Sequence, residues 1–100
     1  MNTVYIPPLA GMRARAKAVM QDVSMDPETV TVNCRDLVAC TGSFVDELIR
    51  QVFTVRHAKS LRVVQVSDKD FIRFLDRQAR AHGVSDRVTV VAATTLEGAA

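Results

Sequence analysis

The sequence predicts an α/β domain with a small, mainly parallel or mixed sheet of four strands and about three helices. Short β-prone segments alternate with longer helical segments, which is typical of strands joined by crossover helices. In the segment 61–66 (LRVVQV), the neighbouring residues Val63 and Val64 are both apolar, as in a central strand that is buried on both faces. We therefore expect Val63 and Val64 both to be buried, with helices on both faces of the sheet. A length of 100 residues fits one such core and not two.

The composition is that of a folded globular chain. Apolar residues make up 48% of it and charged residues 24%, which is far from a disordered composition. The apolar stretches are too short to cross a bilayer, and the N-terminus lacks the pattern of a secretory signal. We therefore expect a cytoplasmic protein that does not interact with membranes. Residues 1–93 are expected to form the domain and residues 94–100 a flexible tail.

The first half of the chain contains three predicted elements. Residues 3–6 are β-prone and precede two prolines, which predicts a short edge strand or an extended arm. Residues 11–23 have apolar side chains at intervals of three and four, which predicts a helix with one buried stripe. Residues 29–34 alternate between polar and apolar side chains, which predicts a strand half covered by the core.

The second half repeats the alternation of helix and strand. Ser43 is expected to cap a helix over residues 43–53. After the strand at 61–66, Ser67 is expected to cap a helix that ends at Gly83, where a left-handed residue is favoured. A last strand follows at residues 87–92. The order is therefore β-α-β-α-β-α-β.

Residues 30–53 carry a resemblance to a known family. The strand VTVNC, the turn LVACT and the helix GSFVDELIRQVF are similar to the signature of the STAS-like domain family of unknown function. Members of that family have a strand ending in an acidic-aromatic pair, a Ser/Thr-rich turn, and Phe-Ala-Asp-Glu-Leu opening a helix. The run Arg13-Ala14-Arg15-Ala16 also resembles the family's first helix. The resemblance extends over residues 11–92 in the order of elements.

This resemblance implies a non-enzymatic regulatory module that binds another protein. Related STAS domains include the antagonists of bacterial anti-sigma factors, so the implied partner is a kinase, an anti-sigma factor or another regulator. In the antagonist branch, a kinase phosphorylates a serine just before the second helix and so breaks the complex. A phosphate at a helix N-terminus adds about two negative charges where a partner must dock.

The chain departs from the family pattern at the phosphorylated turn. Asn33-Cys34 replaces the acidic-aromatic pair, and Ala39-Cys40-Thr41-Gly42 stands where the antagonists have Asp-Ser-Ser/Thr-Gly. Alignment on Gly42 places Cys40 at the acceptor position, whereas alignment on Phe44 places Thr41 there. The candidate phosphoacceptors are Thr41 and Ser43.

The resemblance places the partner surface at the turn 39–43 and the outer side of helix 43–53. This helix is expected to bury its apolar side chains and to expose its polar ones, including Gln51. The residues predicted to contact the partner are Cys40, Thr41, Gly42, Ser43, Asp46, Glu47 and Arg50.

Signals for a cofactor, metal or nucleic acid are missing from the sequence. The cysteines Cys34 and Cys40 lack the spacing of a redox or zinc motif, and no glycine-rich phosphate loop is present. A net charge of +2 without a basic stripe on one element does not indicate a nucleic-acid binder. Asp46 and Glu47 point about 100° apart on a helix, unlike the facing carboxylates of a hydrolase. We therefore expect no enzymatic activity, no cofactor and no metal.

Three alternatives remain open at this point. One is a phage-encoded or accessory effector that captures a host protein with the same fold. Another is a small ligand- or nucleotide-binding domain that uses the carboxyl ends of the parallel strands. A homodimer is also an option, since the segment 3–6 can pair with the edge of another chain.

Overall fold

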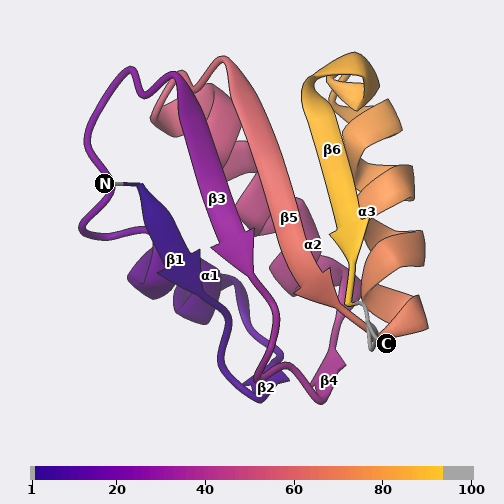
Figure 1. The fold of residues 1–100 in the computed structure, drawn as a ribbon. Helices are drawn as coiled ribbons and strands as arrows, with labels where there is room; N and C mark the ends of the chain where they lie inside the picture. Colours follow the sequence, from indigo (N-terminus) through magenta and orange to yellow (C-terminus); the bar gives the residue numbers. More distant parts are fainter. Residues whose placement is uncertain (1, 94–100) are drawn as a thin grey trace.

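The computed structural model describes residues 2–93, so the expected tail 94–100 lies outside the described residues. The predicted order of four strands and three helices is confirmed, with two further short strands (Figure 1). The elements are β1 (Thr3–Tyr5), β2 (Leu9–Ala10), α1 (Arg13–Val19), β3 (Thr29–Asn33), β4 (Ala39–Cys40), α2 (Gly42–Ile49), a π-helical segment (Arg50–Val55), β5 (Ser60–Val66), α3 (Lys69–Ala81), a 3-10 turn (Ser85–Arg87) and β6 (Val88–Ala92).

The main sheet has the order β1-β3-β5-β6, and every neighbouring pair is parallel. The segment 3–6 contributes an edge strand that pairs with β3 of its own domain, from Thr3 opposite Thr31 to Tyr5 opposite Asn33. The short strands β2 and β4 form a separate parallel ribbon below the sheet (Figure 1). The prediction of a mainly parallel sheet is thus confirmed.

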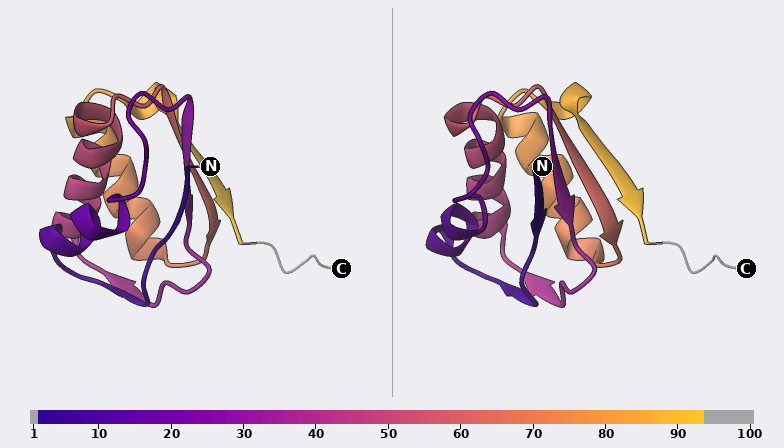
Figure 2. Two further views of the ribbon diagram at one scale, coloured as in Figure 1. Left: turned by 90° about the vertical axis from the view of Figure 1, so that its left-hand side faces the viewer. Right: turned by 60° about the vertical axis from the view of Figure 1, so that its left-hand side comes forward.

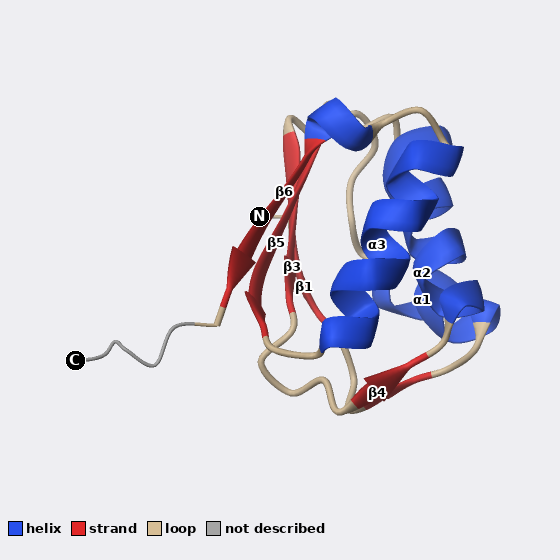
Figure 3. Cartoon of the chain, turned by 90° about the vertical axis from the view of Figure 1, so that its right-hand side faces the viewer, coloured by secondary structure: helices blue, strands red, loops and turns tan. Residues whose placement is uncertain are grey.

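All three helices cover the same face of the sheet (Figures 2 and 3). The strands follow one another across the sheet in the order in which they occur in the sequence. Because the crossovers between parallel strands are right-handed, this order places every connecting helix on the same side of the sheet. The expectation of helices on both faces was therefore wrong. Val63 points into the helical layer and is fully buried, whereas Val64 points to the open face and is only partly buried.

The core lies between the sheet and the helices. Its largest fully buried side chains are Phe44, Phe71, Ile6, Met20, Leu48, Ile49, Leu61, Leu75, Val30, Val32, Val45 and Val52. The open face of the sheet instead carries polar contacts, such as the hydrogen bond between Thr29 Oγ1 and Ser60 Oγ at 2.8 Å. On the same face, the guanidinium of Arg35 lies 4.9 Å from the ring centroid of Tyr5. Hydroxyl-bearing side chains allow this face to be hydrated without a second layer.

The helix boundaries differ from the expected ones at several caps. Helix α1 is shorter than the expected 11–23, and no side chain caps its start. The N-cap of α2 is Thr41 in place of Ser43, and that of α3 is Asp68 in place of Ser67. Gly83 has φ +71°, as expected for the residue that ends α3. Among residues 2–93, every helix is too short or too polar to traverse a lipid bilayer.

Candidate functional site

The predicted turn lies at the end of the molecule where the sheet strands β1, β3 and β5 finish (Figure 1). There β2 and β4 pair to form the ribbon, with Leu9 opposite Ala39 and Ala10 opposite Cys40. The backbone N–H of Thr41 donates to the carbonyl of Ala10 at 3.0 Å, which continues the ribbon into α2. Hydrogen bonds therefore connect the turn to the segment before α1. Helix α1 follows β2 and helix α2 follows β4, so both begin next to the ribbon.

Thr41 uses its hydroxyl within the protein. Oγ1 donates to the carbonyl oxygen of Gly11 at 2.8 Å and accepts from the backbone N–H of Phe44 at 3.2 Å. The second bond satisfies a backbone donor in the first turn of α2, which is the role of an N-cap. Thr41 thus links the start of α1 to the start of α2.

The next two residues lie in the first turn of α2. Gly42 is partly buried, and a Cβ at this position would lie 3.8 Å from the ring of Phe74, an ordinary contact. The side chain of Ser43 is exposed. Both hydroxyl-bearing residues of the turn, Thr41 and Ser43, are therefore exposed, and the hydroxyl of Thr41 is used in two hydrogen bonds within the protein.

Cys40 is half-buried in the ribbon and faces a carboxylate. Its Sγ donates a weak hydrogen bond to Oδ2 of Asp68 at 3.6 Å. Burial, and then the negative charge of Asp68, raise the pKa of the Cys40 thiol to about 12. This direction is opposite to the lowering that a helix N-terminus produces, so the thiol stays protonated at neutral pH and is a poor nucleophile.

Asp46 does not point freely to solvent as expected for a partner contact. Its Oδ2 lies 2.7 Å from Nη1 of Arg13, and its Oδ1 lies 2.6 Å from Nε2 of His82. The hydrogen bonds from His82 and Arg13 hold the pKa of Asp46 below its usual value. Because these partners belong to α1 and to the end of α3, Asp46 links all three helices on their outer side.

The expectation that Glu47 and Gln51 lie on the outer side of helix 43–53 was wrong. Glu47 is 4% exposed and Gln51 is 6% exposed. Nε2 of Gln51 donates to Glu47 Oε2 at 2.7 Å, and Nε of Arg50 lies 3.2 Å from the same oxygen. Burial pushes the pKa of Glu47 up, but these partners outweigh it and the pKa is lowered. Helix α1 packs against this side of α2, so the polar pair is covered.

A groove that the sequence reasoning missed lies beside the predicted turn. It has a volume of about 330 Å³ and two strongly exposed apolar side chains, Leu9 at 68% and Met12 at 65%. Val38, at the start of the ribbon, is 69% exposed. The groove is lined by Leu9, Ala10, Gly11, Met12, Arg15, Ala39, Cys40 and Thr41. We call it the ribbon groove.

Two-residue strands explain why the groove was missed. Periodicity needs at least four residues to indicate a strand, and β2 and β4 are too short to show any. Leu9 was the available signal, because an apolar residue outside any periodic element has no predicted place in the core. Met12 was expected in the buried stripe of the predicted helix 11–23, and this was wrong, because α1 begins at Arg13 and Met12 is exposed.

The residues that the structure describes contain no cluster of three or more His, Cys, Asp or Glu side chains suited to a metal ion. Comparisons of this chain with protein-family profiles, with curated proteins and with solved structures found no match.

Proposed function

We propose that the protein is a non-enzymatic regulatory module that binds another protein through the ribbon groove and the adjoining first turn of α2. The observation that carries the proposal is the exposure of Leu9 and Met12 in a concave surface. Large apolar side chains that share an exposed hollow favour association with another apolar surface. This surface adjoins the turn for which the STAS-like resemblance implies partner binding.

The polar groups around the groove favour a protein partner over a small ligand. Small-molecule sites need a few convergent polar groups that are free to orient the ligand. In the ribbon groove, the hydroxyl of Thr41 is engaged by Gly11 and Phe44, and the thiol of Cys40 faces Asp68. For this reason, binding of a nucleotide or another small ligand is a weaker proposal than binding of a protein.

The lining also defines the chemistry of the partner segment. Arg15 is the one charged side chain that lines the groove, and the others are apolar, small or already hydrogen-bonded. We therefore propose a partner that inserts an apolar side chain and places an acidic residue near Arg15. A kinase or an anti-sigma factor with such a segment fits the regulatory role that the resemblance implies.

Ser43 is the phosphoacceptor that we favour if the module is switched by phosphorylation. Its side chain is exposed in the first turn of α2, where backbone N–H groups favour a phosphate. Thr41 is less suited, because a phosphate there would remove the hydroxyl proton that Thr41 donates to the carbonyl oxygen of Gly11. A phosphate on Ser43 would add charge beside an apolar groove and so oppose docking.

Site-specific crosslinking tests the proposal. A photoreactive residue in place of Ala39 should give one dominant adduct in extract from the native host. The double variant Leu9→Ser/Met12→Ser should lose that adduct, because it removes the apolar contact. Met25→Ser is the matched control, since Met25 is also exposed but does not line the groove.

The control variant should retain the adduct. An adduct that survives in the double variant, or no protein adduct at all, would contradict the assignment of the groove. Identification of the crosslinked protein by mass spectrometry also separates a native regulator from an effector that captures a foreign host protein. A retained small molecule in native mass spectra would favour the ligand-binding alternative.

A further inference from the structure

The outer edge of β6 is an apolar surface apart from the ribbon groove. Within residues 2–93, β6 pairs with β5 on one side and with no strand on the other (Figure 1). Its sequence VTVVA has neither charge nor proline, and Val90 and Val91 are 40% and 39% exposed. Natural edge strands are normally protected by charge, proline or a covering element. We propose that a second copy of this chain covers the edge through antiparallel β6–β6 pairing about a twofold axis.

The strand is complementary to itself in the required direction. With Val90 on the axis, Val90 faces the partner's Val90 and Val88 faces the partner's Ala92. Thr89 then faces the partner's Val91 on the open face of the sheet. Every pair therefore joins uncharged side chains, most of them β-branched, which are favourable cross-strand neighbours.

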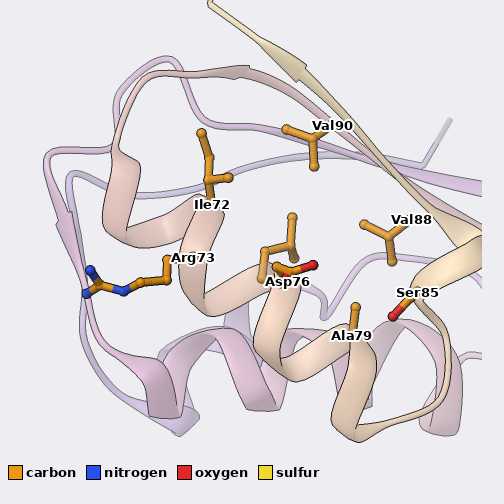
Figure 4. A pocket seen from close by; sticks show the side chains of 8 residues that line it. Ile72, Arg73, Asp76, Ala79, Ser85, Val88 and Val90 are labelled. Carbon is orange, nitrogen blue, oxygen red and sulfur yellow. The ribbon is translucent and has the colours of Figure 1, made fainter.

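A groove between β6 and α3 supports the same arrangement. It has a volume of about 420 Å³. Ile72 lies across from Val90, and Val88 lies closer to Ala79 (Figure 4). The groove is lined by Ile72, Arg73, Leu75, Asp76, Ala79, Ser85, Val88 and Val90. Pairing of two β6 strands would bring the two α3 helices side by side over the join and fill both grooves at once.

The charged side chains on this part of α3 are paired within the chain. Arg73 Nη2 lies 2.9 Å from Asp70 Oδ1, and Arg80 Nε lies 3.2 Å from Asp76 Oδ2. The side chain of Arg73 extends away from Val88 and Val90 (Figure 4). The apolar side chains Ile72, Val88 and Val90 are therefore the part of the groove that a second copy would cover.

The other edge of the sheet explains why the arrangement would close as a dimer. Strand β1 has only three residues, and Pro7 and Pro8 follow it after Ile6. A short strand with prolines beside it offers little pairing. Head-to-tail pairing of β6 with β1, which would form open filaments, is thereby disfavoured relative to the twofold pairing.

The dimer edge and the ribbon groove are separate surfaces, so this inference does not rest on the proposed function. The ribbon lies below the carboxyl ends of the strands, whereas β6 lies along one side of the sheet (Figures 1 and 3). Antiparallel pairing would place the two ribbon grooves at opposite ends of the dimer. One dimer would then hold two partner molecules far apart.

Sedimentation of the 100-residue chain, with Val90→Lys as the disrupting variant, tests the inference. The native chain should sediment as a dimer at micromolar concentration. Val90→Lys should raise the dissociation constant by more than about tenfold, because it places two like charges on the axis. Val38→Lys is the matched control, since Val38 is more exposed than Val90 but lies next to β4, away from β6. This variant should remain dimeric.

A second variant keeps the test informative if Val90→Lys fails to fold. Thr89→Lys changes a side chain that is exposed on the open face of β6, and it should also weaken the dimer, because it places a charge beside the partner's Val91. Val90→Cys should form an intersubunit disulfide on mild oxidation, since directly opposed residues have Cα atoms about 4.5–5.5 Å apart.

Three results would overturn the inference. The first is a native chain that remains monomeric up to its highest soluble concentration. The second is a dimer broken by Val38→Lys but not by Val90→Lys. The third is a Thr89→Lys variant that dimerises as tightly as the native chain. In the first case, the edge is covered by the chain itself or remains open to solvent.

Discussion

Asp46 and Glu47 show how far single residues can be interpreted from sequence. Their position near the start of a helix was recognised, and so was their inability to act as facing carboxylates. What lies opposite them depends on how α1 and α3 pack against α2, and no local pattern contains that information. Asp46 contacts Arg13 and His82, and Glu47 contacts Gln51 and Arg50. Two residues assigned to a partner surface therefore belong to the internal structure.

We predict that Asp46→Asn lowers the free energy of unfolding at neutral pH by about 1 kcal/mol. The variant should also lose less stability than the native chain when the pH is lowered. The folded-state pKa of Asp46 is lowered, so its stabilising contribution is complete above the unfolded pKa and disappears as the pH falls through the folded pKa. Urea unfolding at about pH 7 and about pH 3 measures the difference. Asp36→Asn is the control, because Asp36 is exposed and its nearest cation, Arg35, is 3.9 Å away. Equal behaviour of both variants would contradict the role of Asp46.

The two hydroxyls of the turn should behave differently on removal. Thr41→Ala deletes the cap of α2 and a bond to Gly11, so it should lower the free energy of unfolding by about 1–2 kcal/mol. Ser43→Ala should change it by less than about 0.5 kcal/mol, because this side chain is exposed. Denaturant unfolding of both variants checks the assignment. A larger loss for Ser43→Ala would restore Ser43 as the cap that the sequence indicated.

At the scale of elements, periodicity located the long segments and failed at their ends. The alternation in 29–34 and the apolar stripe of helix 43–53 predicted β3 and the buried face of α2 correctly. The π-helical segment Arg50–Val55 was not distinguished, because it continues directly from α2, and the ribbon was missed because β2 and β4 are too short to show a periodic pattern. The turn at 39–43 was therefore located correctly, while the groove beside it was found only in the folded chain.

Strand β5 provides a test of the one-sided sheet. Val63→Thr places a hydroxyl in the core without a partner and should lower stability by about 1–3 kcal/mol. Val64→Thr places it on the partly exposed open face, opposite Asn33 and Val91, and should change stability by less than about 0.5 kcal/mol. Thermal or chemical unfolding of this isosteric pair measures both. Equal losses would mean that both faces are covered, as the adjacent apolar residues suggested.

At the scale of the whole molecule, strand count, element order and sheet type were predictable, and the layering was not. Two adjacent valines in β5 were interpreted as burial on both faces. The strand order decides this question, because a sheet has helices on both faces only if the order reverses direction, and here it does not. Strand order is a property of the complete chain, and no single segment specifies it.

The register of the strands also determines how this chain must assemble in time. Paired residues on neighbouring strands lie about 30 residues apart in the sequence, as in Thr3 and Thr31, Thr29 and Ser60, and Leu61 and Val88. Each pair of strands can therefore form only after the connecting crossover has been synthesised. On the ribosome, at roughly 5–20 residues per second, β1 emerges seconds before its neighbour β3. The growing chain therefore passes through a period with unpaired strand edges. Its last strand, β6, completes the sheet, and the outer edge of that strand carries neither charge nor proline.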